Sequence, residues 1–195
     1  MIKKVLATAL LCIFCICAFA QEHASFKGIT LDQSVNSFNE ELKKIGYRYS
    51  DKSEFQNFDV FEFKGNFAGM SDCEIWVYGM KNNGIVFKVI VVSDDYEQWY
   101  SIKTQYNTIK NAMTDKYGKP ENDFHFFSSP YYEGDGYEMS ALKQDKCTYA
   151  AYWHINGNTI VVRMHKSKCI HIVYQDDSNM EIYNGYSSDQ LKNDL

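Results

Sequence analysis

The stretch DCEIWVYGMKNNG, from Asp72 to Gly84, and the stretch DKCTYAAYWHINGN, from Asp145 to Asn158, share three features in the same order. Each contains a cysteine, then an aromatic-rich run that alternates along the chain, and then an Asn-Gly dipeptide. A period of two indicates a strand, and Asn-Gly between two such runs signals a hairpin, because both central residues of a type I′ turn need positive φ. The two stretches therefore predict two β-hairpins of similar construction.

An amphipathic helix is expected before each hairpin. Apolar residues recur at helical spacing over residues 31–45, with Thr30 as the expected N-cap. They do so again over residues 99–113, with Asp94 as the expected N-cap. The aromatic residues of the second stripe are expected to pack on a sheet rather than to hold a ligand.

The order helix, strand, strand, hairpin occurs twice. Matching features lie 72 to 74 residues apart: Gly46 and Gly118, Cys73 and Cys147, Asn83 and Asn156. Other expected elements are strands at residues 60–65, 137–141 and 169–174 and a short helix at 187–195. The predicted fold class is α+β, with two tandem units, each a helix packed on an antiparallel sheet of about four strands.

Residues 1–20 are typical of a secretory signal peptide, with two lysines, an apolar run and the triplet Ala18-Phe19-Ala20 before the cleavage site. The apolar run is shorter than the roughly 20 residues that span a bilayer. We therefore expect a secreted or periplasmic protein that begins at Gln21. Its two units are expected at residues 21–93 and 94–195.

Composition argues against several classes of partner. Removing the first 20 residues takes away two lysines and no acidic residue, so the formal net charge changes from −5 to −7. An acidic protein is repelled by phosphate backbones, so nucleic acid is not expected as a partner. No later run is apolar enough for a membrane span. Cys73, Cys147 and Cys169 remain, so a monomer has one disulfide or none and at least one free thiol.

The tandem of helix-on-sheet units in a secreted chain resembles the β-lactamase-inhibitor-protein architecture. The resemblance covers most of the mature chain at the level of element order, but the paired cysteines in each unit of that family have no counterpart here. It implies a non-catalytic inhibitor that occludes an extracytoplasmic enzyme. The KYGKP and DKC segments also resemble those of small secreted proteins of Gram-negative bacteria, a likeness that implies no activity.

The predicted registers give each hairpin a core face and an opposite face. A two-residue turn at Asn83-Gly84 assigns to the core Cys73, Ile75, Val77, Ile90 and Val92. The opposite face of the first hairpin is strongly apolar, so it is covered either by the other unit or by a partner. Because aromatic residues and arginine are enriched at binding hot spots, the candidate binding residues of the two hairpins are Trp76, Tyr78, Phe87, Tyr152, His154 and Arg163.

A second candidate site is the Pro- and Gly-punctuated loop at residues 128–136, which contains Tyr131 and Tyr132. Loops on rigid scaffolds often carry recognition residues. The two tyrosines either form a contact surface or fold onto the core.

Motifs for catalysis and cofactor binding are absent from the sequence, which contains no Gly-x-Ser-x-Gly elbow, phosphate-binding loop, His-Glu-x-x-His helix or CxxC pair. Cys169 and His171 share a strand face near His165, but no further ligand can be located, so ordinary strand histidines are the preferred interpretation. We therefore predict no catalytic residue, metal or cofactor, and a protein-binding module with an unidentified protein partner. An extracytoplasmic hydrolase and a structural component of the cell envelope are the alternatives.

Overall fold

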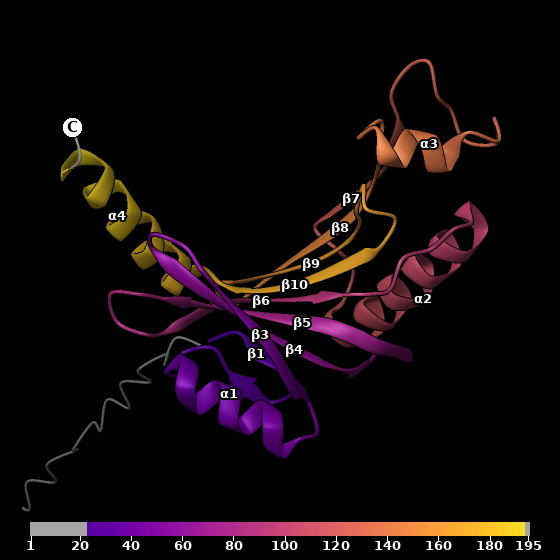
Figure 1. Ribbon diagram of the computed structural model, residues 1–195. Coiled ribbons are helices and arrows are strands. Elements are labelled where there is room, and N and C mark those ends of the chain that lie inside the picture. The colour runs from indigo at the N-terminus through magenta and orange to yellow at the C-terminus, as the bar shows by residue number, and fades with distance from the viewer. Residues whose placement is uncertain (1–22, 194–195) are drawn as a thin grey trace, which may run out of the picture.

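The computed structural model describes residues 23–193 as an α+β fold built on one eight-stranded antiparallel sheet (Figure 1). A separate two-stranded sheet pairs β1 (Ser25–Phe26) with β2 (Ile29–Thr30). The large sheet contains, in spatial order, β3 (Arg48–Glu54), β4 (Phe58–Phe67), β5 (Met70–Met80), β6 (Val86–Val92), β10 (Ile170–Asp176), β9 (Asn158–Met164), β8 (Cys147–Ile155) and β7 (Asn122–Phe127).

The central pair of this sheet is β6 and β10, which pair antiparallel from His171 opposite Val92 to Gln175 opposite Lys88. The prediction of two tandem units, each with its own sheet of about four strands, is therefore wrong: the strands form one continuous sheet. Two separate sheets would each expose an edge strand with unpaired backbone N–H and C=O groups. Pairing β6 with β10 satisfies both edges at once.

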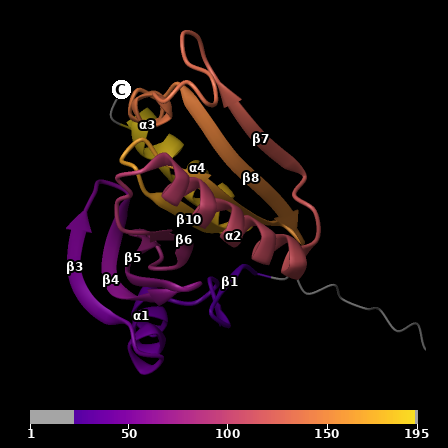
Figure 2. The same ribbon diagram turned by 90° about the vertical axis from the view of Figure 1, so that its right-hand side faces the viewer.

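Two helices cover one face of the sheet, α1 (Val35–Lys44) against β3 and β5, and α2 (Trp99–Tyr117) against β8 and β9 (Figures 1 and 2). They bury their apolar stripes there, which confirms that the stripe of the second helix packs on a sheet. The buried apolar residues of the two helices are Phe38, Leu42, Ile102, Tyr106, Ile109 and Met113.

The other two helices differ from the prediction. Residues 137–141, expected as a strand, lie in the short helix α3 (Glu138–Lys143) and the residue before it. The terminal helix α4 spans Asp177–Asn193 and so begins ten residues before the expected position at 187. Its first turn is held by contacts distant in sequence, since the Asn179 side-chain amide donates to the carbonyls of Leu31 and Val86. Such contacts leave no local sequence signal.

The helix caps also differ in detail. Ser34, not Thr30, is the N-cap of α1, and its Oγ accepts a hydrogen bond from Ser37 N–H at 3.3 Å. Helix α2 begins after Gln98 rather than Asp94. It ends at Gly118, whose φ of 85° suits glycine, as the sequence indicated.

The register of the first hairpin differs from the prediction by one residue. A bulge between Tyr78 and Gly79 replaces the expected two-residue turn geometry, so Trp76 lies opposite Ile90 and not Val91. A one-residue slip moves every following side chain to the other face of the sheet. The main core therefore contains Val89 and Val91, and the face opposite contains Ile90 and Val92, the reverse of the predicted assignment.

The second hairpin confirms its predicted register, with Tyr152 opposite Val161, His154 opposite Thr159 and Ala150 opposite Arg163. Asn156 and Gly157 both have positive φ, as a type I′ turn requires. The sequence therefore specified this hairpin correctly because no bulge intervenes.

Four further expectations concern the signal peptide, the boundary between the two units, membrane spans and the cysteines. The predicted signal peptide lies outside residues 23–193. The expected boundary between residues 93 and 94 falls in the connection between β6 and α2. Across the described part of the chain, no helix combines the length and the apolar character needed to cross a bilayer. Cys73, Cys147 and Cys169 are buried free thiols.

The shared sheet predicts cooperative unfolding of the whole fold. Ile172, on β10 opposite Val91, is fully buried at the join, so Ile172→Ala is expected to lower the free energy of unfolding by about 2–5 kcal/mol. Urea denaturation followed by fluorescence and circular dichroism should show one transition for both proteins. Val173→Ala, a half-buried neighbour on the other face, should have a smaller effect. Two separate transitions would show that the halves unfold independently.

Candidate functional site on the open sheet face

The sheet face opposite α1 and α2, called here the open face, carries the predicted hairpin residues. A central cross-strand row of this face runs through five strands and consists of Trp76, Ile90, Val173, Val161 and Tyr152. Trp76, Val173 and Tyr152 are half-buried, and the other two are buried. In Figure 1 the face lies on the side of the sheet away from α1.

Helix α4 covers one end of the open face. Its Tyr183 ring stacks on Phe87 with centroids 4.7 Å apart and an interplanar angle of 7°, and meets Phe58 edge-on at 5.9 Å. Phe87 is consequently only 1% exposed. Among the predicted binding residues, Phe87 is therefore part of the packing beneath α4.

Trp76 and Tyr78 lie beside this covered end and remain half-buried. The indole Nε1 of Trp76 donates a hydrogen bond to Glu74 Oε2 at 3.2 Å. Lys88 Nζ lies 4.4 Å from the centre of the Tyr78 ring, within range of a cation–π interaction. These contacts orient the two aromatic side chains on the open face.

Tyr152 and Arg163 extend the open face across β8 and β9. The Tyr152 ring meets Phe124 edge-on at 5.9 Å. Arg163 lies opposite His171, and its buried Nε has no hydrogen-bond partner within residues 23–193. His154 is exposed at the hairpin end and its Nδ1 lies 2.9 Å from Glu121 Oε2.

The loop tyrosines belong to a different part of the molecule. Tyr131 packs against the main core, and its hydroxyl accepts a hydrogen bond from Gln144 Nε2 at 2.8 Å. Tyr132 is 65% exposed. Glu133 pairs with Lys103 of α2, so the loop is tied to the helix-covered side of the sheet. The structure thus does not join the loop tyrosines to the open face.

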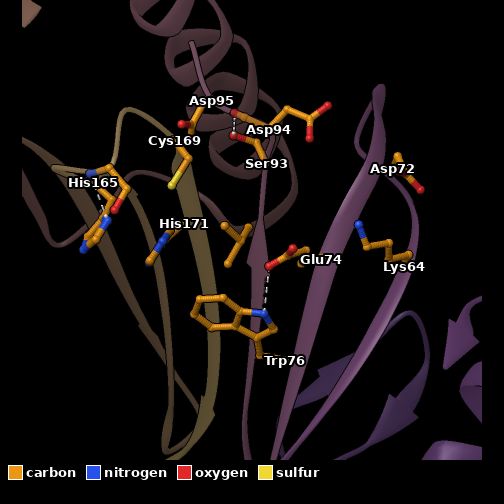
Figure 3. Close-up of a pocket in the computed structure, with 12 residues that line it drawn as sticks. Lys64, Asp72, Glu74, Trp76, Ser93, Asp94, Asp95, His165, Cys169 and His171 are labelled. Carbon is orange, nitrogen blue, oxygen red and sulfur yellow. Dashed lines mark hydrogen bonds between the residues drawn. The ribbon is translucent and has the colours of Figure 1, made fainter. Parts of the chain in front are cut away.

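A pocket of about 780 Å³ lies at the other end of the open face, where β6 and β10 meet the connection to α2 (Figure 3). Trp76 and Val92 contribute apolar surface. Four carboxylates line it against one lysine, Lys64, and these acidic residues are Asp72, Glu74, Asp94 and Asp95. Asp72 and Asp95 pair with Arg48 and Lys168, whereas Glu74 and Asp94 form no ion pair among the described residues. These two carboxylates favour a positively charged ligand.

Within this pocket, the β9–β10 turn brings together His165, Cys169 and His171 (Figure 3). One ligand atom from each, two ring nitrogens and the Cys169 sulfur, all lie within 4.8 Å of one another. The two imidazole rings are nearly parallel, with centroids 4.3 Å apart. The turn is closed by backbone hydrogen bonds from His165 N to Cys169 O and from Lys168 N to His165 O.

The environment sets the protonation state of these groups. Burial, followed by the charges of His165 and Arg163, lowers the pKa of His171 to about 3, so its ring is neutral. Burial, followed by the charge of Asp95, raises the pKa of Cys169 to about 11. At neutral pH the sulfur is a thiol, and the reactive thiolate is scarce. The cluster therefore lacks the activated nucleophile of a cysteine hydrolase.

Comparisons of the chain with protein-family models, curated proteins and solved structures gave no match.

Sequence reasoning identified Cys169, His171 and His165 as neighbours but could not place the group in a pocket. The available signal was the spacing of His, Cys and His across a short turn. The missing part was the wall of the pocket, because Glu74 and Asp95 come from β5 and from the segment after β6. Only the pairing of β10 with β6 brings Glu74 and Asp95 next to Cys169 and His171.

The covering of Phe87 by α4 can be tested directly. Tyr183→Ala removes the stacked ring and is expected to lower the free energy of unfolding by about 1–2 kcal/mol, since an aromatic pair adds about 0.5–1.5 kcal/mol beyond the area it buries. Hydrogen exchange should show faster opening of α4. Ile182→Ala, an exposed neighbour on the same helix, should leave both measurements nearly unchanged. Equal effects from the two variants would contradict this packing.

The thiols should be unreactive in the folded protein. Burial raises the pKa of Cys73 and Cys169 to about 11 and that of Cys147 to about 12. A colorimetric thiol reagent at neutral pH is expected to label a chain of residues 21–195 slowly when native and at three sites when unfolded. Rapid native labelling that Cys169→Ser abolishes would instead identify an activated thiol in the pocket.

Proposed function

We propose that this protein is a non-catalytic binding module of the extracytoplasmic space, whose open face receives a segment of a protein partner. The single observation that carries the proposal is that half-buried aromatic side chains, Trp76, Tyr78 and Tyr152, lie on a sheet face that neither α1 nor α2 covers. The extracytoplasmic location rests on the signal-peptide pattern of residues 1–20.

The apolar character of the open face supports this role. Ile90, Val92 and Cys169 form a buried cluster there, with Trp76, Tyr78 and Val173 packed against it. Aromatic side chains surrounded by smaller apolar residues are typical of the centre of a protein interface. Binding would then proceed by burial of these rings without bond chemistry.

The charges on the open face indicate what kind of segment would fit. Lys88 and Arg163 form no ion pair with a carboxylate among residues 23–193, and the buried Nε of Arg163 lacks a hydrogen-bond partner. Burial, and secondly the charge of Arg163, lower the pKa of Lys88, so the two cations raise each other's free energy. A partner that places a carboxylate near them would relieve both effects. We therefore propose an acidic segment that also carries apolar side chains.

A hydrolase is the second candidate, and the pocket with titratable groups of shifted pKa is the observation that favours it. The direction of the shifts opposes thiol catalysis, because the thiol is held protonated. The binding proposal is therefore preferred.

The proposal is tested by selecting displayed peptides on the mature protein, residues 21–195. Acidic peptides with neighbouring aromatic or aliphatic residues are expected to be enriched. Trp76→Ala should weaken the selected peptides about 30-fold, the loss of about 2 kcal/mol that is typical of a hot spot. Arg163→Gln should weaken acidic peptides selectively, and circular dichroism would verify that each variant is folded.

Tyr100→Ala is the matched control, because this aromatic side chain is 78% exposed on α2, on the other side of the sheet. It should leave peptide binding unchanged. Peptides without an acidic preference, or affinities that the double variant Trp76→Ala/Tyr152→Ala leaves unchanged, would refute the proposed surface.

A further inference from the structure

The His165, Cys169 and His171 cluster has the composition of a metal site. Imidazole nitrogen and thiolate sulfur are the donors that zinc prefers in proteins, whereas calcium and magnesium take oxygen donors. The three donor atoms come from one short turn and the strand after it, and they lie within 4.8 Å of one another. A small rearrangement brings them to the separation that a single ion needs. With zinc–nitrogen and zinc–sulfur bonds of about 2.0–2.3 Å, ligand atoms in a tetrahedral centre lie roughly 3.5 Å apart.

An independent observation points to a ligand here. His171 is 94% buried, at 6% relative exposure, yet its Nδ1 has no hydrogen-bond partner within residues 23–193. A buried polar atom without a partner destabilises a fold unless something satisfies it. An ion bound by the cluster would lie beside the His171 ring and could be coordinated by one of its ring nitrogens.

Binding an ion would break few existing interactions of His165 and Cys169. The ring of His165 has one hydrogen bond, which Ser167 N–H donates to Nδ1 at 3.3 Å on the exposed side of the turn. That contact is lost whichever nitrogen binds an ion, because a neutral imidazole has one nitrogen lone pair, but a long exposed contact is weak. Cys169 is a free thiol at 2% exposure and takes part in no disulfide.

Charges of both signs surround the cluster, with carboxylates on the side of the pocket and cations on the side of β9. Glu74, Asp94 and Asp95 line the pocket together with Cys169, so negative charge lies on that side of the sulfur. Positive charge lies on the other side, where Arg163 is opposite His171 and Lys166 follows His165. Of the four pocket carboxylates, Asp95 and Asp72 already pair with Lys168 and Arg48. Glu74 and Asp94 form no ion pair among the described residues, and they lie in the same pocket as the cluster (Figure 3).

We propose that His165, Cys169 and His171 bind one Zn²⁺ ion through two imidazole nitrogens and a thiolate, with the fourth coordination position facing the acidic pocket. On binding, the Cys169 S–H bond breaks, its electron pair forms the zinc–sulfur bond and the proton passes to water. Three protein ligands and one open position allow the ion to hold a water molecule or a donor atom of another molecule. This proposal does not rest on the proposed protein-binding role, since it is argued from the three donor atoms and the unsatisfied Nδ1 of His171.

The test uses the mature protein in a non-thiol reductant, first stripped of metal by a chelator. Isothermal titration with Zn²⁺ is expected to show one site per chain. Titration with Co²⁺ should give a sulfur-to-cobalt charge-transfer band in the near ultraviolet and visible bands of a tetrahedral centre, both bleached by Zn²⁺. Cys169→Ser should remove the charge-transfer band. His165→Gln should weaken Zn²⁺ binding more than about 100-fold, since loss of even an outer-shell partner weakens binding about 10–100-fold.

Matched controls are available within the chain. Cys73→Ser removes a buried thiol of the main core, and His154→Gln removes an exposed imidazole on β8, so both should leave the cobalt spectrum and zinc affinity unchanged. His165 is only half-buried, so its variant keeps the test informative if Cys169→Ser fails to fold. No charge-transfer band in the wild type, a band that Cys169→Ser retains, or zinc affinity unchanged in His165→Gln would each overturn the proposal.

Discussion

The pairing of β6 with β10 is the constraint on which the rest of the structure depends. It joins strands that lie about 80 residues apart in the chain and satisfies the backbone groups of two strands that would otherwise be sheet edges. Because Val91 and Ile172 lie opposite each other at the join and are fully buried, the core is continuous from α1 to α2. The same pairing brings Cys169 and His171 beside Val92 and Ser93, and so creates the pocket.

The two faces of the sheet follow from this arrangement and from one bulge. Helices α1 and α2 both lie on the face that carries Ile75 and Val91, so the main core is on that side. The bulge at Tyr78 and Gly79 turns Ile90 and Val92 to the opposite side, where they support Trp76. The open face is therefore apolar enough to pack a partner. Its cations Lys88 and Arg163 and its acidic pocket suit different ligands, although Arg163 lies opposite His171 at the edge of the pocket.

The candidate site was only partly predictable. Alternation placed Trp76, Tyr78, Tyr152 and Arg163 on one face correctly, because strand side chains alternate whatever the sheet becomes. Phe87 was expected to be available to a partner, but α4 covers it through a contact far apart in sequence. The sequence left open whether the loop tyrosines face outward or fold onto the core, and the structure packs Tyr131 on the core and exposes Tyr132. The histidine and cysteine spacing was visible in the sequence. The acidic residues around the cluster could not be placed from the sequence, because they belong to β5 and to the segment after β6.

The sequence by itself determined the α+β class, the apolar stripe of α2 and the register of the second hairpin, because these depend on local periodicity and on turn residues that need positive φ. Only the tertiary structure decided that the strands share one sheet, that α4 begins at Asp177, and that the first hairpin contains a bulge. Those outcomes depend on the pairing of distant backbone groups and on side chains such as Asn179 that bond across the fold. Local periodicity does not indicate which distant residues will pair, so these features could not be predicted from the sequence alone.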